Sequence, residues 1–250
     1  MCTTPSATEF VVHSSPSVIV RDFQRPHVWI CDLDADPVVA CSPLVAWFPD
    51  HSATSGRSLL SASELARAER LKSLLERRRF LARCAFVRHV LGNLTGVAPA
   101  ALEFHEGTHG KPRLACSVAA NGRPAALGFN LSHSDNVLAL AVAFGREVGI
   151  DVEVVQPGVD VLAIADAHFT AEESAWLRAL RASECSLAFY RLWTRKEALA
   201  KADGRGIGSL PAVESRADSQ WQLHSFAFKL GEKQIVGALA LGVNALAGAR

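Results

Sequence analysis

The sequence predicts an α+β protein, because stretches with helical spacing and stretches typical of strands alternate irregularly along its 250 residues. Two observations carry this prediction. Apolar residues recur at helical spacing over 63–95 and again from Thr170 to Ala202, whereas 129–155 and 221–243 show short apolar runs separated by turns. Apolar residues make up 49% of the chain and charged residues 20%, which provides for a substantial core and excludes a disordered or fibrous chain.

Charge and cysteine content exclude several classes of protein. Lys and Arg number 26 against 25 Asp and Glu, so the net charge predicts no nucleic-acid partner. The six cysteines are scattered without metal-type pairing, which favours reduced thiols in the cytoplasm. No signal-peptide pattern is present at the N-terminus, and the weakly polar run 235–249 is shorter than the roughly 20 residues of a membrane span. We therefore expect a soluble, cytoplasmic protein with no membrane partner.

The first half of the chain predicts strands around an Arg-rich helical region. Residues 1–60, rich in Pro, Ser and Thr, predict one or two strands set in irregular chain. The region 63–95 predicts two helical pieces, with Ser63 as N-cap and Gly96 as the terminating residue. After it, 129–132, 137–144 and 148–155 predict strands, and the tight Gly145-Arg146 connection predicts that the last two form a hairpin.

The second half predicts two helices followed by a hairpin. Thr170 and Glu173 form a capping box at the start of the first helix. The second helix runs from about Ser186 to Ala202 and ends before Gly204, which is a good C-cap residue. The hairpin joins 221–228 to 235–243.

Two carboxylates stand close together on one predicted strand. Asp151 and Glu153, within Gly-Ile-Asp-Val-Glu, project to the same face because residues i and i+2 of a strand do so. Adjacent carboxylates between apolar neighbours repel each other, and a proton or a cation relieves that repulsion. Mg²⁺ commonly uses one or two carboxylates together with substrate phosphates. A solvated strand edge explains the same spacing, and the spacing alone leaves both interpretations open.

A second polar cluster lies on the predicted helix after Trp193. Glu197 and Lys201 lie one turn apart, with Trp193 one turn before Glu197. One interpretation is an ordinary ion pair beside a buried tryptophan. In the other, Glu197 joins the metal while Lys196 and Lys201 grip phosphates.

Two further motifs are suited to phosphate contacts. Ser132 and His133 are neighbours on a strand, so they point to opposite faces, and no Gly-x-Ser-x-Gly elbow exposes the serine. A polar strand end that hydrogen-bonds phosphate oxygens fits better, with a simple turn as the other interpretation. Lys111 lies in Gly-Lys-Pro, where the alternative is a surface turn. Neither a P-loop nor a dinucleotide fingerprint is present.

In this order and spacing, the motifs resemble one family. Gly-Lys-Pro, Phe-Asn-Leu-Ser-His-Ser, Gly-Ile-Asp-Val-Glu, Phe-Thr-x-x-Glu and Trp-Thr-x-Lys-Glu-Ala-x-x-Lys-x-x-Gly are similar to motifs of the 4′-phosphopantetheinyl transferases, in particular of the Sfp-type (surfactin-synthetase-activating) branch. The resemblance covers roughly residues 77–210. It implies a monomer of two similar α+β halves, 1–145 and 146–250, related by pseudo-twofold symmetry, with coenzyme A in the cleft between them.

The resemblance also implies roles for single residues. The implied Mg²⁺ ligands are Asp151, Glu153 and Glu197. The implied contacts to coenzyme A phosphates and adenosine are Arg79, Lys111, Ser132, His133, Lys196 and Lys201, with Arg77, Arg78 or Arg83 as alternatives to Arg79. Lys201 is also an implied catalytic residue, and Glu173 falls at the position of a candidate general base.

The implied reaction moves the 4′-phosphopantetheine arm of coenzyme A to a Ser of an acyl or peptidyl carrier protein and releases adenosine 3′,5′-bisphosphate. Fatty-acid, polyketide and non-ribosomal peptide carriers are equally compatible with the sequence. Two other classes remain. One is a non-catalytic module of the same fold that binds carrier proteins. The other is a Mg²⁺-dependent phosphodiesterase or nuclease, which is disfavoured because position 155 is Val where such a core would have Lys.

Overall fold

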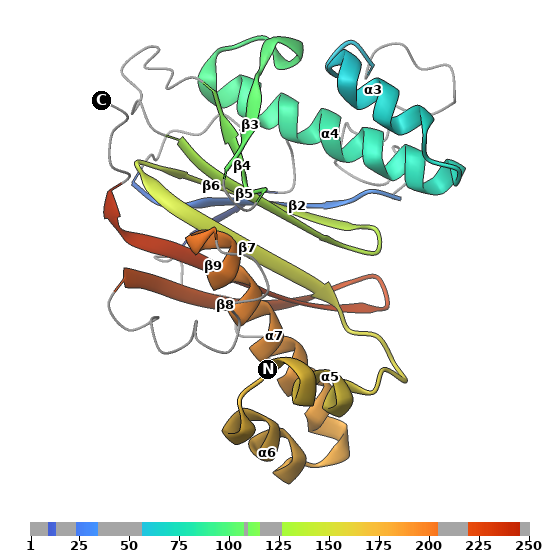
Figure 1. The fold of residues 1–250 in the computed structure, drawn as a ribbon, viewed down its shortest axis with the longest axis vertical. Coiled ribbons are helices and arrows are strands. Elements are labelled where there is room, and N and C mark those ends of the chain that lie inside the picture. Colours follow the sequence, from blue (N-terminus) through green and yellow to red (C-terminus); the bar gives the residue numbers. More distant parts are fainter. Residues whose placement is uncertain are drawn as a thin grey trace.

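The computed structural model describes residues 10–13, 24–34, 57–107, 110–115, 127–204 and 220–245. Within this part of the chain, helices pack against two antiparallel-rich sheets that lie next to each other (Figure 1). The predicted α+β class is thus confirmed. None of the helices described is long and apolar enough to cross a bilayer.

A four-stranded sheet forms the N-terminal core in the order β1-β2-β6-β5. Its strands are β1 (Val11–His13), β2 (His27–Asp32), β5 (Leu127–Ser134) and β6 (Val137–Phe144). The first two confirm the strands expected in residues 1–60. Every residue of β6 is buried, as expected for a central strand covered on both faces. A smaller two-stranded sheet pairs β3 (Phe104–Glu106) with β4 (Pro112–Leu114).

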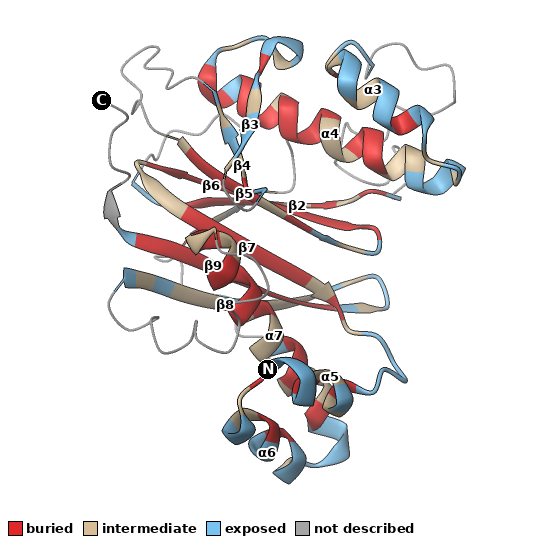
Figure 2. Ribbon diagram, in the orientation of Figure 1, coloured by how far each residue is buried: buried red, intermediate tan, exposed pale blue. Residues whose placement is uncertain are grey.

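The Arg-rich region forms two helices, as predicted, but the first begins differently. Helix α3 (Ala62–Glu69) is capped by Ser61 rather than Ser63, because Ser61 and Glu64 complete a capping box. Helix α4 (Leu74–Thr95) ends at Gly96, whose φ of 76° lies in the left-handed region that favours glycine. A short 3₁₀ turn, η1 (Pro99–Ala101), follows. Figure 2 shows that α4 buries one side against the N-terminal sheet.

The C-terminal sheet corrects one sequence-based prediction. It has the order β7-β9-β8, with β7 (Arg146–Val154), β8 (Trp221–Leu230) and β9 (Lys233–Ala245). The β8–β9 hairpin is confirmed, but β6 and β7 do not form a hairpin. Both edges of β6 are already paired, with β2 and β5, so the turn at Gly145 carries the chain into a different sheet.

In the part of the chain that the structure describes, three helices follow β7. They are α5 (Val161–His168), α6 (Ala171–Ala179) and α7 (Ala182–Asp203). The sequence did not predict α5. The capping box of Thr170 and Glu173 is confirmed at the start of α6, and α7 ends at left-handed Gly204, although it begins before Ser186. Helix α7 crosses the C-terminal sheet (Figure 1).

The two sheets share one apolar layer, in which Val137 and Ala139 of β6 lie in the same buried cluster as Ile150 and Val152 of β7. Strand β5, the neighbour of β6, also lies beside β7. Cys31, Cys84 and Cys185 are free thiols, whereas Cys2, Cys41 and Cys116 lie outside the described residues. The meeting point of β5, β7 and α7 is where the polar motifs of the sequence converge.

Candidate active site

A row of polar side chains on β5 contacts β7 across the boundary between the two sheets. Residues 130, 132 and 134 alternate along β5 and therefore share one face. The contacts are Ile150 N to Asn130 Oδ1 at 2.9 Å, Ser132 Oγ to Asp151 Oδ1 at 2.8 Å and Ser134 Oγ to Glu153 Oε2 at 2.6 Å. Side chains of one sheet thus fix the strand that carries both predicted carboxylates.

Asp151 has one oxygen fully engaged and the other without a partner. Lys201 Nζ, from α7, donates to Asp151 Oδ1 at 2.6 Å and to Ser132 Oγ at 3.0 Å. Asp151 is only 2% exposed, and its Oδ2 is buried with no hydrogen-bond partner. Burial raises the pKa of Asp151, against the lowering effect of Lys201.

Glu197 completes a cluster of three carboxylates around one ammonium group. It lies one helical turn before Lys201 and is buried, and its Oε1 has no hydrogen-bond partner. Burial, followed by the charge of Asp151, raises the pKa of Glu197 to about 7. Burial also raises the pKa of Glu153. A buried carboxylate oxygen without a partner costs free energy, so the cluster is suited to take up a cation or a proton.

The cluster fits a hard divalent ion in its chemistry. All of its donors are carboxylate oxygens, which Mg²⁺ prefers, and two of them are orphaned. In the described part of the chain, however, no three His, Cys, Asp or Glu side chains are already arranged as a metal site. In this conformation Lys201 supplies the positive charge beside Asp151.

His133 points away from this cluster, as the alternation of the strand requires. Burial lowers its pKa, and the charge of Arg83, on α4, lowers it further. Ser132 and His133 therefore serve opposite sides of β5, with Ser132 toward Asp151 and His133 toward the Arg-rich helix.

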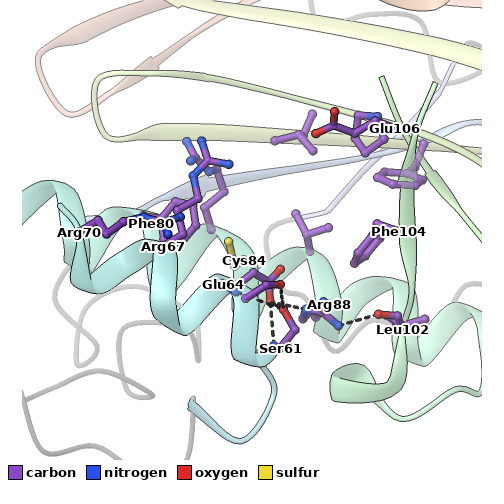
Figure 3. Close-up of a pocket in the computed structure, with 16 residues that line it drawn as sticks. Ser61, Glu64, Arg67, Arg70, Phe80, Cys84, Arg88, Leu102, Phe104 and Glu106 are labelled. Carbon is purple, nitrogen blue, oxygen red and sulfur yellow. Dashed lines mark hydrogen bonds and ion pairs between the residues drawn. The ribbon is translucent and has the colours of Figure 1, made fainter. Parts of the chain in front are cut away.

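On the helix side of β5 lies a cavity of about 590 Å³ (Figure 3). Its walls come from α3, α4, the β3–β4 ribbon and β5, and include the rings of Phe80 and Phe104. Arg67 and Arg83 place their guanidinium groups 5.4 and 5.5 Å from the centre of the Phe80 ring. Among the residues described, no carboxylate forms an ion pair with Arg67 or Arg83. The cavity is therefore suited to an anion that carries a flat ring.

Two other arginines near this cavity are used by the fold. Arg88 donates to Glu64 Oε2 at 2.7 Å and to two backbone carbonyl oxygens. Arg79 pairs with Asp34 and, at 2.9 Å, with Asp135, and it does not line the cavity. The predicted contact of Arg79 with a coenzyme A phosphate stays a prediction that this geometry does not support. Which arginine faces the cavity depends on how α4 is rotated against the sheet, and the sequence carried no signal for that.

Lys196 and Glu173 form a pair of their own. Lys196 is fully buried, with Nζ 2.9 Å from Glu173 Oε1 and 5.4 Å from the centre of the Phe169 ring. Glu173 Oε2 accepts from Thr170 N at 2.8 Å. Both oxygens of Glu173 are thus engaged. The predicted phosphate contact of Lys196 and the predicted base role of Glu173 stay predictions without geometric support.

Lys111 is buried at the junction of β4, β7 and α7. Its ammonium donates to Glu147 Oε2 at 2.7 Å, to Val148 O at 3.0 Å and to Ala202 O at 3.1 Å. An ammonium has three N–H donors, so this set uses all of them. The structure therefore gives Lys111 a bracing role, and its predicted phosphate contact stays a prediction without geometric support.

Replacing Lys111 with Met is expected to lower the free energy of unfolding by about 2–4 kcal/mol. The carbonyl oxygens of Val148 and Ala202 and the Oε2 atom of Glu147 would each lose the ammonium that donates to them. We expect the affinity for coenzyme A, measured by calorimetry at a temperature where the variant is folded, to change little. Lys229→Met, at an exposed position of β8, is the matched control and should leave stability unchanged. A stable Lys111→Met variant with lost coenzyme A affinity would contradict the bracing role.

Together, the carboxylate cluster and the Arg-lined cavity form a site suited to a phosphorylated ligand. Residues 147–244 match the model of the 4′-phosphopantetheinyl transferase superfamily. The chain is 39% identical to the 4′-phosphopantetheinyl transferase HetI of a Nostoc species over 66% of this chain and 68% of that protein. It is 38% identical to AcpT of Salmonella typhimurium, over 47% and 57%, and 32% identical to psf-1 of Bacillus pumilus, over 60% of each.

The chain therefore belongs to the 4′-phosphopantetheinyl transferase family. The general family resemblance predicted from the motifs is confirmed, and the matched part includes Asp151, Glu153, Glu197 and Lys201.

Proposed function

We propose that this protein transfers the 4′-phosphopantetheine group of coenzyme A to a serine hydroxyl of an acyl or peptidyl carrier protein, in a Mg²⁺-dependent reaction. The observation that carries the proposal is the pair of orphaned, buried carboxylate oxygens, Asp151 Oδ2 and Glu197 Oε1, on two elements that face each other beside Lys201. A merely structural cluster would be expected to satisfy its buried oxygens. Family membership supplies the reaction class.

Coenzyme A is proposed to use both faces of β5. Its adenine and 3′-phosphate fit the cavity between Arg67, Arg83 and the aromatic walls, with His133 alongside. Its pyrophosphate then lies toward Ser132 and Lys201 at the carboxylate cluster.

The proposed reaction is an attack of the carrier serine oxygen on the β-phosphorus of coenzyme A. A new P–O bond forms to serine, the P–O bond to the adenosine-side phosphate breaks, and adenosine 3′,5′-bisphosphate leaves. Lys201 places an ammonium where negative charge develops, which is the main form of help that phosphoryl transfer needs. The hydroxyl of Ser132 donates to Asp151 and accepts from Lys201, so it orients that ammonium. The serine proton passes to a nearby acceptor, for which Glu173 remains a candidate on resemblance alone.

Mg²⁺ would be held by Asp151, Glu153 and Glu197, and when bound it neutralises the pyrophosphate and the leaving group. Asp151 and Glu153 are positioned by β7, and Glu197 is positioned by α7. Ser132 and Ser134 each occupy one carboxylate oxygen, and Lys201 balances the remaining charge.

We further propose that the chain is a cytoplasmic monomer of the Sfp-type branch, built from the pseudo-symmetric halves 1–145 and 146–250. In support of the two similar halves, α4 and α7 are both 22-residue helices that end at a left-handed glycine and pack on a β-sheet. Relatives from two Bacillus species match at 32% identity.

The test is the intact mass of apo carrier proteins of the fatty-acid, polyketide and peptide types after incubation with the protein, coenzyme A and Mg²⁺. We expect one phosphopantetheine group to be added to at least one carrier, and none with EDTA or when the carrier serine is replaced by Ala. No added mass with any carrier would overturn the proposal. Binding of a carrier indifferent to Mg²⁺ would then favour a non-catalytic module, and cleavage of phosphodiesters would favour a nuclease.

A further inference from the structure

We infer that Ser134 is a positioning residue, which holds Glu153 in the orientation from which it can share a divalent cation with Asp151. The inference rests on the proposed function and concerns a residue outside the predicted ligand set. Ser134 Oγ lies 2.6 Å from Glu153 Oε2 and 3.1 Å from Val154 N. Ser134 is the last residue of β5, and Glu153 is on β7, so the contact joins two different sheets.

The two contacts of Ser134 fix the direction of its single hydroxyl proton. The backbone N–H of Val154 is a donor, so it occupies a lone pair of the hydroxyl oxygen. The hydroxyl proton is then directed to Glu153, whose ionised carboxylate only accepts. A hydrogen bond of this kind to a charged acceptor is shorter and stronger than one between neutral groups. One oxygen of Glu153 is therefore held, and the rotation of its carboxylate is restricted.

The residue that follows Ser134 is fixed by ion pairs to two different parts of the fold. The next residue, Asp135, has a φ of 52°, an uncommon conformation for a residue other than glycine. Arg79 from α4 pairs with Asp135 at 2.9 Å, and Lys233, the first residue of β9, pairs with it at 2.6 Å. The hairpin end that presents Ser134 is therefore tied to α4 and to the C-terminal sheet together. This gives Arg79 a role in the site that differs from a contact with coenzyme A.

The same arrangement occurs two residues earlier on each strand. Ser132 binds one oxygen of Asp151, and Ser134 binds one oxygen of Glu153, so two serines on β5 orient two carboxylates on β7. Groups that orient a ligand of a metal in this way commonly alter metal affinity about 10- to 100-fold when removed. A free glutamate side chain has several rotatable bonds, and restricting them before the cation arrives reduces the entropy lost on binding.

The test measures Mn²⁺ affinity of the full chain by calorimetry or electron paramagnetic resonance, without turnover. We expect Ser134→Ala to weaken Mn²⁺ binding about tenfold. Ser134→Thr, which keeps the hydroxyl and suits a strand, should restore an affinity close to that of the unchanged protein. In a Glu153→Gln background the Ser134→Ala change should have little further effect, because both act through one carboxylate.

Each outcome is decisive. Equal Mn²⁺ affinity for Ser134→Ala and the unchanged protein overturns the inference, and so does a full additional loss in the Glu153→Gln background, which would indicate a general loosening of the fold. If the unchanged protein transfers phosphopantetheine and binds Mn²⁺, either of these two outcomes overturns only the role of Ser134 and leaves the proposed function standing. If the unchanged protein neither binds Mn²⁺ nor modifies any carrier, the proposed function fails together with this inference.

Discussion

Asp151→Asn is expected to lower the rate of phosphopantetheine transfer by about a hundred- to a thousandfold, the scale at which a preorganised charged group acts in a water-poor site. The amide keeps the size of the side chain and the oxygen that accepts from Ser132 and Lys201. It removes the negative charge, and it puts a neutral group at the orphaned Oδ2 position. The initial rate of mass gain on a carrier protein, at saturating coenzyme A and Mg²⁺, measures the effect.

The same variant should not unfold more easily when metal is absent. Burial raises the pKa of Asp151 in the folded state, so the folded protein binds this proton more strongly than the unfolded chain does. At neutral pH, ionisation of Asp151 therefore opposes folding of the metal-free protein. Removing that charge leaves the melting temperature of the metal-free protein equal or higher. Asp166→Asn, at an exposed ion pair with Arg178, is the matched control and should retain its rate. If the melting temperature of Asp151→Asn instead falls sharply, the carboxylate of Asp151 stabilises the fold, and this prediction is wrong.

Local signals predicted much of the fold. The capping box of Thr170 and Glu173, and the terminating glycines Gly96 and Gly204, depend only on neighbours in sequence. The prediction that Asp151 and Glu153 project together likewise needs only the twofold period of a strand. These features were predictable because their causes lie within one turn or one strand.

Features that depend on packing between distant segments were not predictable. The turn at Gly145 is compatible with a hairpin, and only the pairing of both β6 edges elsewhere excludes one. Lys111 is engaged because β7 and the end of α7 come together around it. Arg83 lines the cavity, whereas Arg79 pairs with Asp34 and Asp135, which lie far away from it in sequence.

Helix α7 can approach β7 closely because residue 149 of β7 is a glycine, which has no side chain. A Cβ atom placed on Gly149 would lie 2.1 Å from Ala198 O and 2.4 Å from Ala202 N, both of which are backbone atoms of α7. Real Cβ contacts are never this short, and no rotamer change can relieve a clash between two backbones. The small residues Ala198 and Ala202 pack on Ala238 and Ala240 at the same interface. Glycine at this position therefore sets the distance between the helix and the strand of the site.

Gly149→Ala is accordingly expected to destabilise the protein by about 3 kcal/mol, at the upper end of the usual range for overpacking, which corresponds to a loss of roughly 6–12 °C in melting temperature. Because Glu197 and Lys201 each adjoin a displaced alanine of α7, a shift of about 1 Å should also reduce transfer about a hundredfold in the protein that remains folded. Gly242→Ala on β9, where the nearest heavy atom is 3.4 Å away, is the matched control and should change neither quantity appreciably. Equal melting temperatures and rates for the two variants would show that the helix can move without disturbing the carboxylate cluster, and would remove the geometric basis for placing Glu197 beside Asp151.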